Sequence, residues 1–188
     1  MIYYPMSVLM NAGIRDILII STPQDTPRLK YLLGDGHQFG INLTYAVLPS
    51  PDGLAQAFII GADFIGIDTM VKVLGDNIFA GHGLKKRLKA AVENAETGKG
   101  ASLNVELLGQ GFTWLDTGTH ESLVEATNYV KTTEQHQHRK IAGLKKIAYV
   151  NGWINRKDIL AVYEVLKKNQ NGQYLKDILD GKYLDMLH

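Results

Sequence analysis

With 188 residues, of which 45% are hydrophobic and 21% charged, the chain has the length and composition of a globular domain and not those of a disordered or fibrous protein. Its formal net charge of +1 excludes a strong overall attraction to nucleic acid or to an acidic membrane surface. The absence of cysteine excludes disulfides and thiolate metal sites and agrees with a reducing compartment.

Residues 1–10 are largely apolar but contain no basic residue, and Pro5 interrupts them, so they lack the pattern of a secretory signal. A later apolar stretch, residues 58–67, is too short to span a bilayer and contains Asp63. We therefore expect a cytoplasmic protein that binds neither membranes nor nucleic acids.

The first half of the chain alternates between strand and helix patterns. The β-branched run Ile14–Ser21 predicts a strand, and Thr26-Pro27 predicts the start of a helix that ends at Leu33. The elements predicted next are a strand over residues 41–48, a helix over residues 54–62, a strand over Met70–Leu74 and a helix over residues 84–95. This alternation is typical of a parallel, doubly wound α/β sheet.

Beyond residue 95 the pattern changes. The segments predicted here are a loop over residues 96–101, a strand over residues 103–108 and a shorter strand over residues 111–115. Thr119 then predicts the N-cap of a helix of about 18 residues, and the tail is largely helical after a second cap at Asn155. We expect an α/β domain over residues 1–118, with a helical C-terminal region over residues 119–188 packed on it.

The first candidate for chemistry is Asp76, in the sequence Leu74-Gly75-Asp76-Asn77. A carboxylate just beyond the C-terminal end of a parallel strand lies where open α/β sheets bind their ligands. There it can bind Mg²⁺ together with substrate phosphates and water. The alternative is that Asp76 only forms an Asx turn before Ile78, because Gly, Asp and Asn are ordinary turn residues.

The second candidate is the turn of residues 49–53, PSPDG. Pro51 stiffens it, and Gly53 allows a ligand to approach the backbone at the start of the predicted helix, where exposed N–H groups attract hydrogen-bond acceptors and negative charge. The alternative is a plain turn between a strand and a helix.

Taken together, the segments of the chain resemble a known family. The matching strings are IYYP, AGIRDILIIS, LLGDG, PSPDGLAQAF and LGDNIF within residues 1–93, followed by GFTWLDTGTHESLVEA and IAYVNGWI. In this order they resemble the sugar-1-phosphate nucleotidyltransferases, in particular the glucose-1-phosphate thymidylyltransferase family, over nearly the whole chain. The resemblance implies a Rossmann-like nucleotidyltransferase fold, here an incomplete three-layer α/β/α sheet with a helical C-terminal part.

The resemblance also implies a reaction. Its members transfer a thymidylyl group from dTTP to glucose 1-phosphate with Mg²⁺ and release pyrophosphate, early in dTDP-rhamnose synthesis. By position, Asp76 matches the metal-binding aspartate, Leu74 lines the nucleotide pocket, and Pro51 and Gly53 match the loop on which the base packs. No residue of this chain is assigned to covalent catalysis, and a homo-oligomer is a possible assembly.

Four departures from the family pattern bear on activity. The chain starts at a methionine that is internal in the family, so the Gly-rich phosphate loop is absent. Near residues 100–102 the sequence skips a middle section that the resemblance credits with the EKP motif and the second metal aspartate. Leu48 replaces a glutamine that reads the thymine edge, and Lys72 places a charge in a strand expected to be buried.

These departures leave two hypotheses: a thymidylyltransferase with impaired activity, and a catalytically inactive remnant that retains nucleotide binding or subunit pairing. Without the first strand, we expect Ile14–Ser21 and Met70–Leu74 to become neighbours, or a strand from the C-terminal half to fill the gap. His136 and His138 are expected to be solvated and not to form a metal pair. Because Ala80 and Val150 replace a tyrosine and an arginine, we expect no end-product regulatory site.

Overall fold

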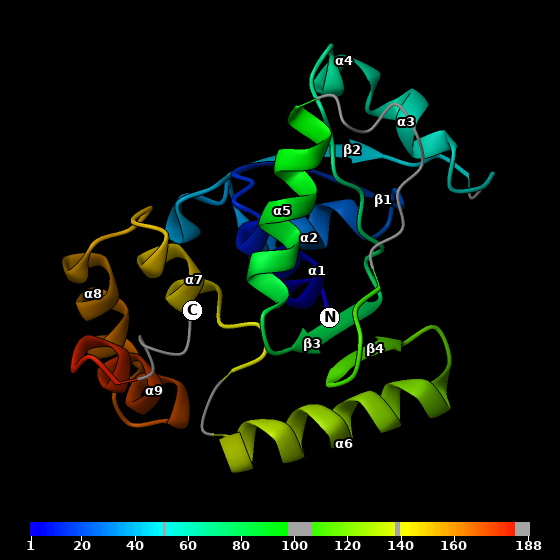
Figure 1. The fold of residues 1–188 in the computed structure, drawn as a ribbon. Coiled ribbons are helices and arrows are strands. Elements are labelled where there is room, and N and C mark those ends of the chain that lie inside the picture. Colours follow the sequence, from blue (N-terminus) through cyan, green and yellow to red (C-terminus); the bar gives the residue numbers. More distant parts are fainter. Residues whose placement is uncertain (51, 98–106, 138–139, 183–188) are drawn as a thin grey trace. The chain divides into compact units, whose positions relative to one another are not determined.

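The computed structural model describes residues 1–50, 52–97, 107–137 and 140–182, and it has a mixed α/β fold (Figure 1). The chain divides into two compact units. One is the continuous segment Ile14–Val71, and the other combines Met1–Gly13 with Lys72–His188. None of the helices in the described ranges is long and apolar enough to cross a membrane.

The described residues form the following elements in chain order: α1 (Tyr3–Ala12), β1 (Asp16–Ser21), α2 (Thr26–Leu33), a 3-10 turn (His37–Phe39), β2 (Asn42–Val47), α3 (Gln56–Ile60), α4 (Ala62–Ile65), β3 (Asn77–Gly81), α5 (Leu84–Glu96), β4 (Phe112–Asp116), α6 (His120–Gln137), α7 (Leu144–Val150), α8 (Arg156–Leu166) and α9 (Gln170–Leu179).

The unit Ile14–Val71 is built on the parallel pair β1 and β2, with α2 as the connection between them. Parallel strands need such a crossover, and a helix is the usual one. Alternate residues of β1, Ile17 and Ile19, are buried and form part of its core. The turn before β2 requires glycine at position 36, because its φ is +86° and a Cβ there would lie 2.8 Å from the Ile41 carbonyl oxygen.

In the second unit, α1 is the buried element. Met6 and Met10 are 2% and 0% exposed, and α1 packs against β3, α5 and α7. Asn151, the residue that follows α7, reinforces this contact: its side-chain amide donates to the Met10 carbonyl oxygen at 3.0 Å. This ten-residue helix is buried on most sides and thus organises elements from distant parts of the chain.

Strands β3 and β4 of this unit form an antiparallel pair, in which Asn77 is opposite Asp116 and Phe79 is opposite Trp114. Helix α6 runs alongside β4 (Figure 1). The Thr119 hydroxyl accepts the Ser122 backbone N–H at 3.1 Å, which confirms the predicted cap of this 18-residue helix.

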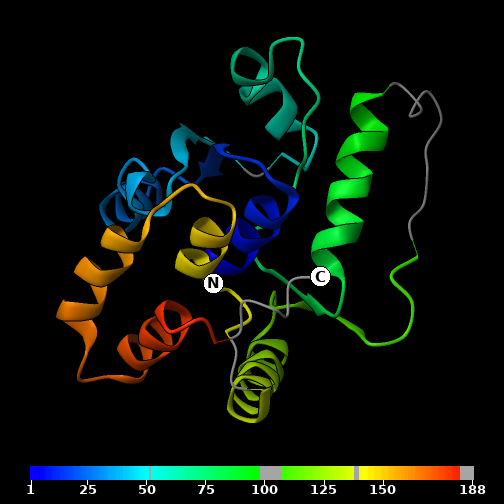
Figure 2. The ribbon, with the colours of Figure 1, turned by 60° about the vertical axis from the view of Figure 1, so that its left-hand side comes forward.

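The C-terminal helices α8 and α9 lie against each other (Figure 2). The predicted cap at Asn155 is confirmed as a complete capping box: its side chain accepts two backbone N–H groups, and the Asp158 carboxylate accepts the N–H of Asn155. Ile159, Ile178 and Leu175 are 0%, 0% and 5% exposed, so the interface between these helices is apolar.

The predicted α/β fold class, the two strands at Ile14–Ser21 and 41–48, and the helix over residues 84–95 are confirmed. The strand predicted over Met70–Leu74 is wrong. This segment forms no strand and has no strand partner among the described residues, and its apolar side chains are partly exposed; the strand begins instead at Asn77, where β4 pairs with it. Lys72 is consequently exposed, so its charge is not buried in a strand.

Two further expectations are corrected. The helix predicted over residues 54–62 is divided at Gly61 into α3 and α4. A Cβ at this position would lie 3.0 Å from the Ala57 carbonyl oxygen and 3.3 Å from the Leu18 side chain, so glycine suits this point of division. The expected pairing of Ile14–Ser21 with Met70–Leu74 is not formed: in the described part of the chain β1 pairs with β2, and the C-terminal strand β4 pairs with β3. The strand predicted over residues 103–108 lies mostly outside the described residues.

Candidate functional site

Asp76 lies in the turn immediately before β3, and its backbone is fixed by the residue that follows β4. Thr117 donates both its backbone N–H, at 3.1 Å, and its hydroxyl, at 2.8 Å, to the Asp76 carbonyl oxygen. Because β3 and β4 are antiparallel, the start of one strand and the end of the other meet at the same end of the sheet. The two segments that flank this end are therefore joined directly.

The Asp76 side chain is held by its neighbour Asn77, whose amide nitrogen donates to Asp76 Oδ1 at 2.8 Å. Asn77 is buried, at 6% exposed, and its amide oxygen accepts the indole N–H of Trp114 at 2.7 Å. Within the described residues, no hydrogen bond joins the Asp76 carboxylate to the backbone N–H of Ile78. The Asx turn, the alternative explanation for this sequence, is thus not formed.

A second carboxylate, Asp116, lies at the same end of the sheet. Its Oδ1 accepts the backbone N–H of Gly118 at 3.0 Å. A Cβ added to Gly118 would be 3.3 Å from Asp116 Oδ1 and 3.9 Å from Asp76 Oδ2, so the two carboxylates face a common space beside this glycine. From the sequence, the second metal carboxylate was expected in the missing middle section. Asp116 was not predicted, because its proximity to Asp76 follows only from the strand register.

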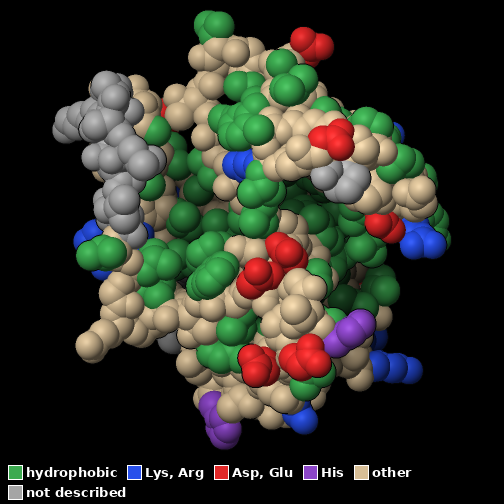
Figure 3. Space-filling model, turned by 90° about the vertical axis from the view of Figure 1, so that its right-hand side faces the viewer, with side chains coloured by type: hydrophobic (Ala, Val, Ile, Leu, Met, Phe, Trp, Pro, Cys, Tyr) green, Lys and Arg blue, Asp and Glu red, His purple; other side chains and the backbone are tan. Residues whose placement is uncertain are grey.

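These two side chains fit the oxygen chemistry of a divalent cation. Mg²⁺ is usually bound through one or two carboxylates, with substrate phosphates and water as its other ligands. In the described ranges there is no group of three or more His, Cys, Asp or Glu side chains that would form an all-protein metal site. Several other acidic side chains lie on the surface drawn in Figure 3. What distinguishes Asp76 and Asp116 as candidate metal ligands is that their carboxylates face the same space.

The other predicted site residues are distributed as follows. Leu74 precedes the Asp76 turn and is 38% exposed, which leaves its side chain available for an apolar contact. Gly53 belongs to the unit Ile14–Val71 and has a φ of +109°, with no atom within 4 Å of an added Cβ. Pro51 lies outside the described residues. Leu48 continues the β1–β2 pairing through its N–H to the Ser21 carbonyl oxygen.

The loop that contains Gly53 is closed by side-chain hydrogen bonds. Ser50 donates to the Asp52 carboxylate, and Gln56 both accepts the Asp52 backbone N–H at 3.2 Å and donates to its carboxylate at 3.3 Å. Helix α3 starts three residues after Gly53, at Gln56. Gly53 is therefore an exposed glycine in a loop closed by side-chain hydrogen bonds, and the helix predicted to begin directly after it, at residue 54, begins two residues later.

A pocket of about 140 Å³ occupies another part of the larger unit, between α1, the start of α5 and α7. Ala80 and Val150, which stand where the family has a tyrosine and an arginine, both line this pocket and therefore lie close together. Lys85 also lines this pocket and donates to the Asn151 side chain at 3.0 Å; burial, and secondarily the charge of Lys89, lowers the pKa of its ammonium group.

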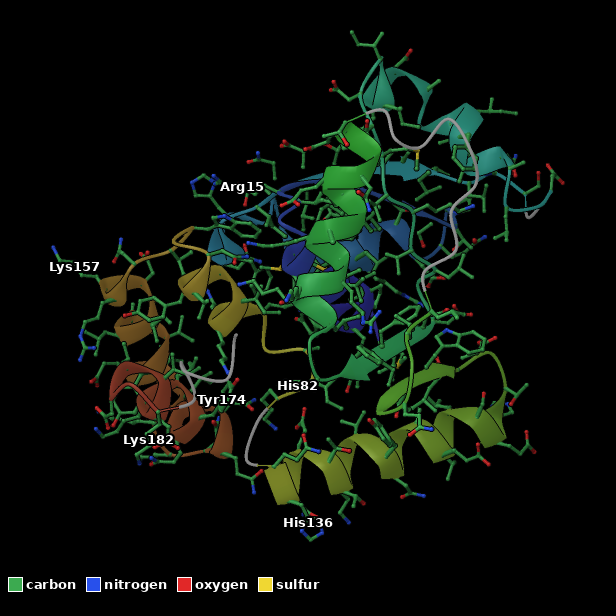
Figure 4. The ribbon with its side chains drawn as sticks, in the orientation of Figure 1. Arg15, His82, His136, Lys157, Tyr174 and Lys182 are labelled. Carbon is green, nitrogen blue, oxygen red and sulfur yellow. The ribbon has the colours of Figure 1, made fainter. Side chains whose placement is uncertain are left out.

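The histidines contribute no site of their own among the described residues. His82 follows β3, and His136 projects from the C-terminal end of α6 (Figure 4). His138 lies outside the described residues. The expectation that His136 is solvated agrees with its exposed position.

Comparison of the sequence with known proteins identifies the family of this chain. The family model of the nucleotidyl transferases matches residues 1–106, more than half of the chain, and the chain therefore belongs to this family. It is 40% identical to the glucose-1-phosphate thymidylyltransferase of Neisseria meningitidis, over 95% of this chain and 88% of that protein. The enzymes of the same name from Xanthomonas campestris and Mycobacterium tuberculosis are 37% and 34% identical over 93% and 96% of this chain.

The same comparison shows that the chain is shortened internally. Its alignment with the Neisseria meningitidis protein extends over 254 residues, whereas the whole chain has 188, so the relative carries at least 66 residues within the aligned region that this chain lacks. The junction expected near residues 100–102 falls outside the described residues.

Proposed function

We propose that this chain is a glucose-1-phosphate thymidylyltransferase by descent, with activity impaired by its internal shortening. The proposed reaction is the transfer of a thymidylyl group from dTTP to glucose 1-phosphate with release of pyrophosphate, in the cytoplasm and early in dTDP-rhamnose synthesis. The observation that supports it best is the convergence of Asp76 and Asp116 in a member of the nucleotidyl transferase family.

The two carboxylates would hold Mg²⁺. When bound, this ion would neutralise charge on the reacting phosphates and help to align them. Asp76 is suited to this role because its backbone is fixed by Thr117 and one of its carboxylate oxygens by Asn77, so the other oxygen has a defined direction. Asp116 is similarly fixed through Gly118.

The nucleotide-binding residues that we propose are those predicted from the sequence, Pro51, Gly53 and Leu74. Gly53, which has no side chain and an unobstructed face, would bring its backbone to the base edge, with Pro51 packed on the base. Leu74 would supply an apolar contact near the metal site. Leu48 cannot form the hydrogen bonds of a base-reading glutamine, so we expect weak discrimination between thymine and other bases.

The alternative is a catalytically inactive remnant that still binds nucleotide or pairs with other subunits. The absence of at least 66 residues that the relative carries favours it, because substrate-positioning groups removed together reduce the rate by many orders of magnitude. In either case we propose a homo-oligomer and a helical C-terminal region starting at residue 119. Native mass measurement and limited proteolysis test these two points.

The decisive experiment measures pyrophosphate release by the purified chain with dTTP, glucose 1-phosphate and Mg²⁺. The proposed activity requires release above the background, which Asp76→Ala and Asp116→Ala should each abolish, whereas the control Asp68→Ala, at an exposed loop position, should leave it unchanged. No release by a folded protein would reject the enzymatic proposal. A thermal shift with dTTP would then show whether nucleotide binding survives, as the remnant hypothesis requires.

A further inference from the structure

Three side chains are connected in series at the start of β3. The Trp114 indole N–H donates to Asn77 Oδ1 at 2.7 Å, and the Asn77 amide nitrogen donates to Asp76 Oδ1 at 2.8 Å. Trp114 comes from the middle of β4, so the series links the two strands through side chains as well as through their backbones. It ends at the carboxylate that is proposed to hold the cation.

The direction of this series is fixed by chemistry. An indole nitrogen can only donate a hydrogen bond, so the atom of Asn77 that faces Trp114 must be the amide oxygen. The amide nitrogen then necessarily faces Asp76, where it donates to one carboxylate oxygen. Without Trp114, the amide of Asn77 could turn over and present its oxygen to Asp76, which would repel the carboxylate.

These hydrogen bonds make the two carboxylate oxygens of Asp76 different. Oδ1 is occupied by Asn77, while Oδ2 is the oxygen that faces the space beside Gly118, toward Asp116. In the described part of the chain, Oδ2 has no hydrogen-bond donor. The series therefore leaves one oxygen of Asp76 directed at the second carboxylate.

We propose that Trp114 and Asn77 are positioning residues that orient Asp76 so that it and Asp116 bind one divalent cation. This inference rests on the proposed metal-binding role of Asp76 and assigns the orientation of that carboxylate to two residues that do not themselves bind the ion. Partners of this kind typically change metal affinity about 10- to 100-fold when they are removed.

Trp114 is a favourable position for the test because it is 56% exposed, in contrast to Asn77 at 6%. Trp114→Phe removes the indole N–H and retains an aromatic ring opposite Phe79 in the sheet. The other tryptophan, Trp153, lies in the turn after α7, and Trp153→Phe is the matched control.

The experiment measures Mn²⁺ and Mg²⁺ affinity of the full-length chain by calorimetry and by electron paramagnetic resonance of Mn²⁺, without nucleotide turnover. Trp114→Phe should weaken Mn²⁺ binding about 10- to 100-fold and lower the thermal midpoint of the metal-free protein only slightly, through the lost donor to Asn77, whereas Trp153→Phe should bind like the parent. Asn77→Ala should weaken binding equally, and the double variant should be no weaker than either single variant, because both residues act through one connection.

Three results would overturn the inference. Unchanged affinity in Trp114→Phe, with binding lost in Asp76→Asn, would reject the positioning role and retain the metal site. Additive losses in the double variant would show that the residues act independently. Absence of Mn²⁺ binding by the parent protein would reject the metal role and the positioning role together. If Trp114→Phe does not fold, Asn77→Ala and Asn77→Ser provide the same comparison against Asp76→Asn.

Discussion

Gly172 sets how closely α9 approaches the end of α8, and Gly172→Ala tests this packing. A Cβ at Gly172 would lie 2.1 Å from the Leu166 carbonyl oxygen, 2.4 Å from its carbonyl carbon and 2.8 Å from Lys167 Cα, all of them backbone atoms. Van der Waals contact requires about 1 Å more, so α9 must move away from α8. No side-chain rotation can relieve the overlap.

Two effects of opposite sign determine the magnitude. Alanine is favoured over glycine within a helix by about 1 kcal/mol. Forced separation of packed elements costs about 1–3 kcal/mol, and loss of the hydrogen bond from the Gly172 N–H to the Asn169 side chain, 2.9 Å long, costs about 1 kcal/mol more. We expect a net destabilisation of about 2 kcal/mol, or a thermal midpoint lower by about 4–8 °C for a chain of this size.

The assay is equilibrium urea unfolding followed by circular dichroism, with Asn171→Ala as the control at the adjacent exposed position. The control should change the free energy of unfolding by less than about 0.5 kcal/mol. A Gly172→Ala protein as stable as the parent, or more stable, would show that helix propensity dominates and that α8 and α9 are not packed as closely as the structure indicates.

Further predictions concern the cap, the core and the turn of the fold, each measured by the same unfolding assay. Asn155→Ala should lower the free energy of unfolding by about 1 kcal/mol because it removes the side-chain oxygen that accepts the backbone N–H groups of Lys157 and Asp158, and Asn155→Asp should recover most of it; equal stability of all three would contradict the cap. Ile78→Ala, at a side chain that is 1% exposed beside the candidate site, should cost about 2–5 kcal/mol, and a loss below about 1 kcal/mol would mean that β3 is not buried. Gly36→Ala should cost more than about 1 kcal/mol since φ is +86° and the Cβ would strike Ile41, whereas Gly13→Ala, also at positive φ but without a close neighbour, should cost less.

The sequence predicts best those features that depend on local chemistry. The caps at Thr119 and Asn155, the helix start at Thr26-Pro27 and the strands around Ile17 and Leu43 depend on neighbouring residues, and all were found. The two caps can be recognised because the residue that satisfies the exposed backbone groups is only a few positions away.

Pairing between distant segments explains what was missed. Met70–Leu74 and Asn77–Gly81 both have strand-like composition, and only the partner β4 decides between them. Asp116 escaped notice for the same reason, since its relation to Asp76 depends on a strand register about forty residues apart, outside the reach of local patterns. The helix α1 had no recognisable cap signal, and its core role depends on residues from the other end of the chain.

The unit that combines Met1–Gly13 with Lys72–His188 is discontinuous in sequence, and this determines the order in which the two units can fold. The segment Ile14–Val71 contains its own contacts and is complete once it has left the ribosome. The apolar side chains of α1 are synthesised before β3, α5 and finally α7, against which they pack, and Asn151, which follows α7, bonds to Met10 across 141 positions. Because chains are synthesised at about 5–20 residues per second, these side chains lack their packing partners for several seconds in every nascent molecule. We therefore expect α1 to be a segment on which a chaperone acts.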